Sequence, residues 1–247
     1  IQNGRKECNS IPQSIPSIGQ HSKIRSAICT ASLIGLLLLC LSASAQDDEC
    51  YFPGQTYRFN TTYDEDWVYK WTATSGTIDK DNTSEINWTP DLVGPVTLMV
   101  TAYNNATLGN LNASCIDADM MNLTVCPLAT IIIEKDTVPD SPQDFEFVFD
   151  DGNNSVPFLL DDDADPALLN NRTFGNLLPG TYIVNETALY CWNLSYIQST
   201  GNATVEIGNG TSYDADYQAG DSSVRITLNP GDVSTCIFTN TRKLGNI

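Results

Sequence analysis

Apolar residues alternate with polar ones along most of this chain, and no segment keeps the period of an amphipathic helix. The segment 144–150 places phenylalanine at every second position, and the segment 223–228 does the same with aliphatic residues. Turn-forming pairs such as Pro53-Gly54 separate these segments at spacings of roughly ten residues. This pattern predicts an all-β chain built as sandwiches, with strands at 55–62, 67–73, 84–88, 96–104, 119–126, 130–136, 144–150, 155–160, 180–187, 192–197, 203–207, 223–228 and 235–240.

The first 45 residues are typical of an export signal. Four basic residues precede an apolar run at 27–41, and small residues at 42–45 offer a cleavage site before Gln46. A membrane span needs roughly 20 apolar residues, which is more than this run supplies. We therefore expect a signal peptide at 1–45 and a secreted protein, outside the cell or on its surface, with no stable span in the mature chain. A retained N-terminal anchor is the alternative.

After this signal the chain carries 8 basic and 29 acidic residues, a net charge of −21. Nucleic acids and anionic lipid surfaces require a basic footprint, so neither is expected as a partner. The single histidine, His21, lies within the signal, which leaves no imidazole for nucleophilic catalysis or a His-containing zinc site. No carboxylate pair stands in a cleft-forming context, so we expect no enzyme activity on an external substrate and no cofactor.

Sequons for N-glycosylation are unusually frequent. The composition alone predicts about 3–4 matches to N-x-[ST] in the mature chain, and twelve are present. We interpret them as a densely glycosylated surface, which together with the acidity favours an archaeal envelope over a eukaryotic secreted protein. The alternative is that Asn, Ser and Thr merely serve turns. The acceptors are Asn60, Asn82, Asn87, Asn105, Asn112, Asn122, Asn153, Asn171, Asn185, Asn193, Asn202 and Asn209.

A strand break at Pro127 divides the mature chain into two β-rich domains, 46–127 and 128–247. Each is long enough to bury a core of its own. Because the linker is only a few residues around 127–128, we expect a rather stiff, end-to-end arrangement.

Each domain contains a set of short motifs. Those of the first are FPGQTY at 52–57, YKW at 69–71, INWTP at 86–90 and GPVTLMVT at 94–101. With these motifs the first domain resembles a PKD/Ig-like domain, although the usual W-D-F-G-D-G signature is absent. Those of the second are KDTVP at 135–139, LDDDADP at 160–166, LPGTY at 178–182, ET at 186–187 and CIFTNT at 236–241. With these motifs the second domain resembles a prealbumin-like domain of the SpaA/CnaB type. Such domains recur in archaeal and bacterial surface proteins.

The second resemblance implies an intramolecular isopeptide bond between Lys135 and Asn240, promoted by Glu186. Strand alternation supports this assignment, because each residue shares a face with apolar neighbours and should point into the core. Burial there favours a neutral lysine, which is a nucleophile, and a protonated glutamate, which can polarise the amide. The alternative is a buried Lys135–Glu186 ion pair with Asn240 as a structural hydrogen-bonding partner.

Five cysteines follow the signal, and in an exported chain without C-x-x-C they predict disulfides. Cys236 lies in the last expected strand and Cys191 closely follows the strand of Glu186, so we pair these two. A sandwich would bring Cys50 and Cys126 together at its edges, which leaves Cys115 as a thiol that is free or cross-links a neighbour. The pair Cys50–Cys115 is an alternative.

Two further features have a functional and a structural interpretation. Asp161, Asp163 and Asp165 have a spacing that suits Ca²⁺, but the run lacks the glycine and the distal glutamate of an EF-hand loop. We prefer a solvated acidic turn and predict no metal site. Trp88, inside a sequon, is the one tryptophan that hints at a carbohydrate-binding face.

These features together predict an extracellular structural glycoprotein: a rod of two tandem β-sandwiches for an envelope layer, sheath, stalk or filament. Its expected partners are neighbouring copies, other cell-surface proteins and polysaccharide. A surface adhesin or carbohydrate-binding module is the alternative.

Overall fold

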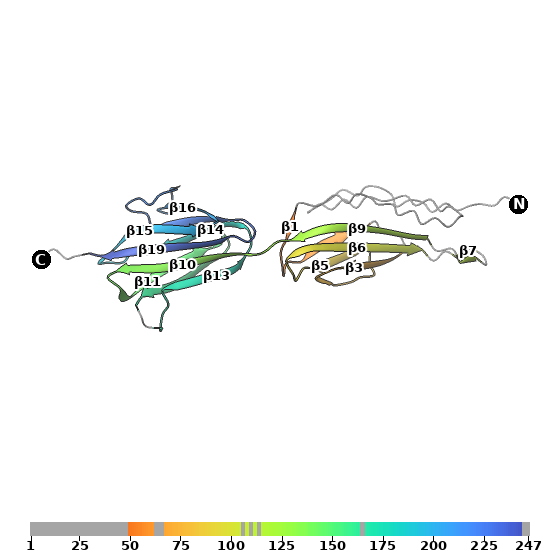
Figure 1. Ribbon diagram of the computed structural model, residues 1–247, viewed down its shortest axis with the longest axis horizontal. Coiled ribbons are helices and arrows are strands. Elements are labelled where there is room, and N and C mark those ends of the chain that lie inside the picture. Colours follow the sequence, from red (N-terminus) through yellow and green to blue (C-terminus); the bar gives the residue numbers. More distant parts are fainter. Residues whose placement is uncertain are drawn as a thin grey trace. The chain divides into compact units, whose positions relative to one another are not determined.

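The computed structural model describes residues 49–61, 67–104, 107–108, 111–112, 115–163 and 166–243. Every regular element within these ranges is a β-strand, which confirms the all-β prediction. Among the described residues there is no helix long and apolar enough to cross a membrane. The expected signal peptide at 1–45 lies outside the described residues. The chain divides into two units, Ile1–Cys126 and Pro127–Ile247. Figure 1 labels many of their strands.

The first unit contains a four-stranded and a three-stranded sheet. The larger sheet has the order β1-β9-β6-β3, in which only the β1–β9 pairing is parallel. Its strands are β1 (Cys50–Tyr51), β9 (Cys115–Val125), β6 (Gly94–Asn104) and β3 (Val68–Ala73). The smaller sheet consists of β2 (Tyr57–Asn60), β5 (Glu85–Thr89) and β4 (Thr77–Ile78), and a short hairpin joins β7 (Thr107–Leu108) to β8 (Leu111–Asn112).

Aromatic side chains from both sheets form the core of the first unit. Trp71 of β3 is buried, and Trp67 packs against the same core at partial exposure. Trp88 of β5 is fully buried, and its indole nitrogen donates a hydrogen bond to the carbonyl oxygen of Ser75 at 2.9 Å. The suggestion that Trp88 marks a carbohydrate-binding face is therefore wrong, because alternation along β5 turns its ring inward.

The second unit contains a four-stranded and a six-stranded sheet. In the four-stranded sheet, β13-β10-β19-β15, the first and last strands of the unit, β10 and β19, pair in parallel. Its strands are β13 (Asn171–Leu177), β10 (Ala129–Val138), β19 (Val233–Arg242) and β15 (Trp192–Gly201). The six-stranded sheet has the order β12 (Ser155–Asp162), β11 (Ser141–Asp150), β14 (Gly180–Glu186), β18 (Ser223–Leu228), β16 (Thr204–Gly208) and β17 (Tyr213–Asp214).

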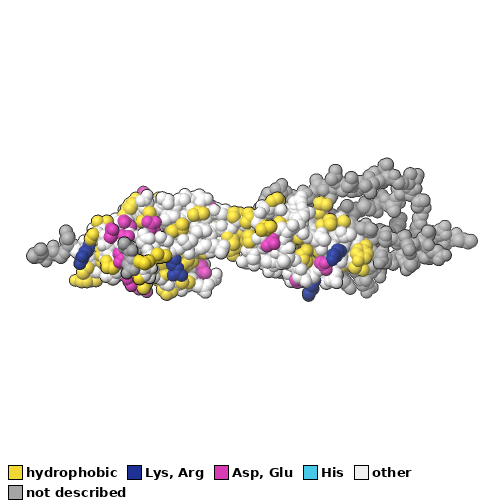
Figure 2. Space-filling model, turned by 60° about the horizontal axis from the view of Figure 1, so that its bottom comes forward, with side chains coloured by type: hydrophobic (Ala, Val, Ile, Leu, Met, Phe, Trp, Pro, Cys, Tyr) yellow, Lys and Arg dark blue, Asp and Glu magenta, His cyan; other side chains and the backbone are white. Residues whose placement is uncertain are grey.

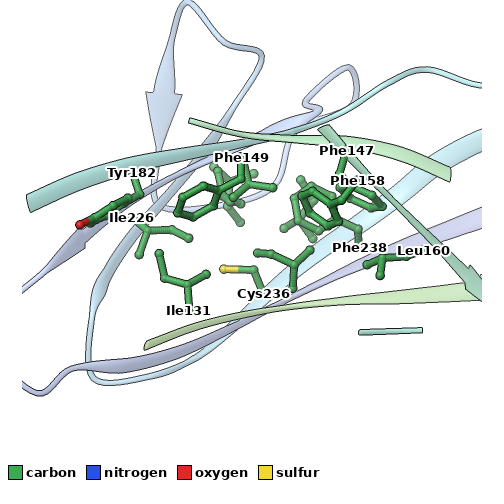
Figure 3. Close-up of a cluster of buried hydrophobic side chains, with 14 of the residues drawn as sticks. Ile131, Phe147, Phe149, Phe158, Leu160, Tyr182, Ile226, Cys236 and Phe238 are labelled. Atoms are coloured by element: carbon green, nitrogen blue, oxygen red, sulfur yellow. The ribbon is translucent and has the colours of Figure 1, made fainter. Parts of the chain in front are cut away.

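Alternating side chains of these two sheets form a single core between them. Along β10 every second residue from Ala129 to Thr137 is buried, as the two-residue period requires. Phe147 and Phe238, which come from facing sheets, meet edge to face with ring centroids 5.2 Å apart (Figure 3). Burial of these apolar side chains stabilises the unit.

All thirteen strands expected from the sequence are present, with ends that differ by a few residues. The longest strand that the sequence did not predict is β13. It lies at a sheet edge, and its side chains are mostly exposed apart from Phe174 and Leu177, which are half-buried. An edge strand of this kind lacks the apolar alternation that identifies a strand in sequence.

Candidate cross-linking site

Lys135 and Asn240 come from the parallel neighbours β10 and β19. In the register of these strands Lys135 is opposite Phe238, and Thr137 is opposite Asn240. Lys135 and Asn240 are thus two positions apart on the same face of the sheet. Both side chains are buried, with exposed fractions of 0% and 3%. On the same strand faces Lys135 follows Ile133 and Asn240 follows Phe238, and these buried apolar residues turn both side chains toward the core.

The Lys135 amine is fixed by three acceptors. Its Nζ donates hydrogen bonds to Oδ1 of Asn240 at 2.9 Å and to the carbonyl oxygens of Phe238 at 2.7 Å and Asp136 at 2.8 Å. The ring of Phe145 lies 4.3 Å from Nζ. These contacts hold the amine beside the Asn240 carboxamide.

Glu186 approaches the same point from the facing sheet. It is the last residue of β14 and is opposite Phe147 in the pairing with β11. Its Oε1 lies 4.0 Å from Nζ of Lys135, and 2% of its side chain is exposed. Among the described residues, neither carboxyl oxygen has a hydrogen-bond partner by distance and angle. An ionised carboxylate without hydrogen bonds is costly to bury, so this geometry raises the fraction of the protonated acid.

Burial shifts the pKa values of both groups toward neutrality. It lowers the pKa of Lys135 to about 8, and the negative charge of Glu186 opposes part of that effect. It raises the pKa of Glu186 to about 7, against the opposing effects of the Lys135 charge and of the nearby Asn240 amide. Both shifts increase the population of an uncharged amine next to an uncharged acid.

The three residues expected at the site are therefore together and buried. The sequence did not identify Phe145 or the carbonyl oxygens of Asp136 and Phe238 as parts of the site. The alternation of Phe145 with Phe147 and Phe149 predicts an inward ring, but its contact with Lys135 depends on which strands face each other. The order in which strands pair is a property of the whole fold, and the local alternation of residues does not predict it.

Cys50 and Cys126 form the predicted disulfide, with Cα atoms 5.5 Å apart and 76 positions between them in sequence. The parallel pairing of β1 with β9 aligns Cys50 with Thr124, which brings it to the end of β9 where Cys126 follows. The side chain of Cys115 lies outside the described residues.

The predicted disulfide between Cys191 and Cys236 is wrong. Neither residue is bonded to a cysteine in the described part of the chain; Cys191 is exposed and Cys236 is buried. In the β15–β19 ladder Trp192 is opposite Arg242, whereas Cys236 is opposite Ser199. The two thiols therefore lie about 20 Å apart along the strands, far beyond the reach of a disulfide. Cys191 is close in sequence to the Glu186 strand, but the register of β15 with β19 keeps it away from Cys236.

The sequon asparagines lie on the outside of both units wherever the structure describes them. Asn185 is half-buried, and Asn105 and Asn112 have side chains outside the described residues. The exposed ones are Asn60, Asn82, Asn87, Asn122, Asn153, Asn171, Asn193, Asn202 and Asn209. Figure 2 shows a surface with scattered Asp and Glu and few Lys or Arg, in keeping with the acidic composition.

Of the Asp161–Asp165 run, the structure describes Asp161, Asp162 and Asp163. Asp161 is buried, and Asp162 accepts hydrogen bonds at Oδ2 from the backbone nitrogen of Thr137 at 2.7 Å and from its hydroxyl at 3.2 Å. Asp165 lies outside the described residues. Within the ranges that the structure covers, no three His, Cys, Asp or Glu residues gather to hold a metal ion.

Comparison with known proteins agrees with the architecture of the second unit. Residues 131–242 match the family model SpaA_4, described as a prealbumin-like fold domain. This part of the chain is therefore a prealbumin-like domain of the SpaA type. No curated protein matches the sequence.

Several solved structures resemble the chain at low identity. The major pilin protein T-13 of Streptococcus pyogenes has 13% identity and a TM-score of 0.33, covering 77% of this chain and 98% of that chain. BcpA, the major pilin subunit of Bacillus cereus, has 10% identity and a TM-score of 0.40. The match covers 78% of this chain and 66% of BcpA. The pilus adhesin SpaC of Lactobacillus rhamnosus GG has 13% identity and a TM-score of 0.31. The match covers 74% of this chain and 30% of SpaC.

Proposed function

We propose that this protein is an extracellular structural protein whose prealbumin-like domain closes itself with an isopeptide bond between Lys135 and Asn240. The observation that carries this proposal is the buried arrangement of an amine, a carboxamide and a carboxylic acid at one point between two sheets. A lysine with 0% exposure has no role in solubility or in surface ion pairs. Its burial is accounted for if its nitrogen becomes part of an uncharged amide.

In the proposed step the neutral Nζ of Lys135 attacks Cγ of Asn240. Protonated Glu186 polarises the carboxamide and transfers a proton to Nδ2, and the carboxylate so formed accepts a proton from Nζ. A bond forms between Nζ and Cγ, the bond between Cγ and Nδ2 breaks, and one ammonia leaves. Glu186 ends in its starting protonation state, so the reaction requires no oxidant, reductant or external reagent.

The bond would join the first strand of the domain to the last. A force that pulls on the two ends of the domain reaches β10 and β19, which are parallel neighbours. In parallel strands pulled from opposite ends, all the ladder hydrogen bonds are loaded in shear. A covalent bond between these strands would carry the load after the hydrogen bonds yield. This property suits a protein that bears tension outside the cell, where unfolded domains have no chaperones to refold them.

The remaining features support a place in an envelope layer, sheath, stalk or filament. The expected export signal, the exposed sequons and the disulfide suit an oxidising exterior. In this proposal the first unit is a PKD/Ig-like spacer, the sequons carry glycans in an archaeal-type envelope, and the partners are copies of the chain or other surface proteins. Trp88 was the residue that suggested carbohydrate binding. Because Trp88 is buried, its ring cannot stack on a sugar at the surface.

Electron microscopy of the purified native protein tests this role. Ordered polymers in material extracted from the cell surface support the structural assignment. The alternative function, an adhesin or carbohydrate-binding module, is tested on the same protein by measuring its binding to glycans and cell-wall polymers. Saturable sugar binding by a protein that remains monomeric at high concentration would contradict the structural role and favour an adhesin.

A further inference from the structure

One loop contacts both the sheet that contains Glu186 and the sheet that contains Asn240. This loop, residues 215–222, joins β17 to β18 and is called the 215–222 strap below. At its C-terminal end the carbonyl oxygen of Ser222 accepts a hydrogen bond from the backbone nitrogen of Glu186 at 2.8 Å. The strap is stiffened by a turn in which the Gln218 nitrogen donates to Oδ2 of Asp221 at 2.6 Å and the Asp221 nitrogen donates to the Gln218 carbonyl oxygen at 3.0 Å.

Tyr217 of the strap reaches the opposite sheet. Its hydroxyl donates a hydrogen bond to the carbonyl oxygen of Leu194 on β15, and its ring meets that of Tyr196 edge to face at 5.9 Å. Both Tyr217 and Leu194 are partly buried and pack against the core. The strap therefore has one contact at the backbone of Glu186 and another at β15.

Tyr217 donates its hydrogen bond to the residue of β15 that lies beside Asn240. Leu194 is the register partner of Asn240, and the ladder shifts by one residue between Leu194 and Tyr196, which marks a bulge at Ser195. Bulges are frequent beside functional sites because they redirect side chains. The Ser195 hydroxyl donates to the carbonyl oxygen of Thr239 at 3.0 Å, which fixes the bulge against β19.

We propose that Tyr217 is a positioning residue for the isopeptide reaction, holding the Glu186 sheet and the Asn240 strand at the separation that the proton transfers require. This inference rests on the proposed function. Formation of the bond needs Glu186 and the Asn240 carboxamide to be in direct contact, and small misplacements of reacting groups cost about 100-fold in rate. Glu186 and Asn240 belong to different sheets, so a side-chain contact that ties the sheets beside both residues helps to set their separation. The Tyr217 hydroxyl is not a proton carrier, since it is committed to Leu194.

The electrostatic environment agrees with this placement. Burial raises the pKa of Tyr217, and the nearby charges of Asp221 and Glu186 raise it further. The phenol therefore stays protonated over the pH range of the reaction and keeps its hydrogen-bond donor.

The test compares cross-linking rates in the full chain. Protein recovered unfolded in denaturant and reductant is diluted into buffer, and loss of ammonia is followed by intact mass. Folding is followed in the same samples by protection of Cys236 against alkylation, because this thiol has 0% exposure in the folded domain. Tyr217→Phe removes only the hydroxyl, Tyr217→Leu removes the ring, and Tyr190→Phe is the control at a tyrosine that is 91% exposed.

We expect Tyr217→Phe to protect Cys236 at the wild-type rate and to lose ammonia about tenfold more slowly, with Tyr217→Leu slower again. Tyr190→Phe should match the wild type in both measurements. Equal rates of ammonia loss in the wild type and in Tyr217→Phe would overturn the role of Tyr217 and leave the proposed function standing. If both Tyr217 variants leave Cys236 reactive, the positioning role is also overturned, because Tyr217 is then required for folding itself. A wild-type chain that folds and never loses ammonia would refute the proposed function as well.

Discussion

Lys135 and Asn240 lie two register positions apart on parallel strands, and Nζ of the lysine is 2.9 Å from Oδ1 of the asparagine. The strands are the first and last of their domain, and the two residues are separated by 105 positions in sequence. A bond between these side chains would enclose nearly all of the domain in one covalent loop. The contact therefore links a local chemical arrangement to the mechanical behaviour of the whole domain.

The rate of cross-linking should have a bell-shaped dependence on pH. Burial lowers the pKa of Lys135 to about 8 and raises that of Glu186 to about 7. Below the lower value both groups are protonated and Lys135 is an ammonium ion that cannot attack. Above the higher value both have lost their protons and Glu186 has none to donate. The reactive neutral pair and the ion pair carry the same number of protons, so their ratio does not depend on pH. Both forms are therefore populated mainly between the two pKa values.

We expect ammonia loss to be fastest between about pH 7 and 8 and to fall about tenfold per pH unit on either side. Intact-mass time courses at a series of pH values measure this profile. Glu146→Gln, a change at an exposed residue of β11, should leave it unchanged. A rate that keeps rising to about pH 10, where an exposed lysine titrates, would contradict a buried lysine coupled to an acid.

Under tension the second unit should resist extension. With Lys135 joined to Asn240, the residues between them cannot be pulled out. Lys135→Met prevents the bond and should add a single unfolding event that releases about 105 residues, roughly 350 Å of contour length. Force spectroscopy measures this length. Lys80→Met, at an exposed lysine of the other unit, is the control that should behave like the wild type.

Loss of the disulfide should destabilise the first unit alone. Cys50 and Cys126 close a loop of 76 positions, for which the chain-entropy account gives about 4 kcal/mol and typical measured values are about 2–4 kcal/mol. Replacing both with serine should lower the unfolding temperature of the first unit and leave that of the second in place. Calorimetry resolves the two transitions, with Cys191→Ser as the control at an exposed thiol. A shared shift of both transitions would show that the two units unfold together.

The two thiols of the second unit should differ sharply in reactivity. Cys191 is exposed and should be alkylated in the native protein, whereas Cys236 is buried and its pKa is raised to about 12, mainly by burial. Peptide mapping after alkylation, before and after unfolding, distinguishes them. If both resist alkylation until a reductant is added, they are paired after all and the register of β15 with β19 is wrong.

The resemblance to SpaA/CnaB-type domains implies the three residues of the site, and local alternation predicts that each of them is buried. Lys135, Glu186 and Asn240 each sit among apolar residues on one strand face, and that pattern places each of them inside the sandwich. Which strands face each other depends on long-range pairing. For this reason the sequence did not place Phe145 next to Lys135, and it paired Cys191 with Cys236, which lie at different levels of the ladder. Trp88 was misjudged for a simpler reason, since a sequon at Asn87 suggested exposure, although only the asparagine of the pair points outward.

The intact mass of the purified protein, after glycan removal, tests the central claim most directly. The wild type should be lighter than its sequence by one ammonia beyond the effect of the disulfide. Glu186→Gln should have the full sequence mass, because glutamine cannot exchange protons with the amine or the amide. Glu146→Gln should show the same loss as the wild type. A wild-type protein that is folded and has the full mass would contradict the account and leave Lys135, Glu186 and Asn240 as a buried structural cluster.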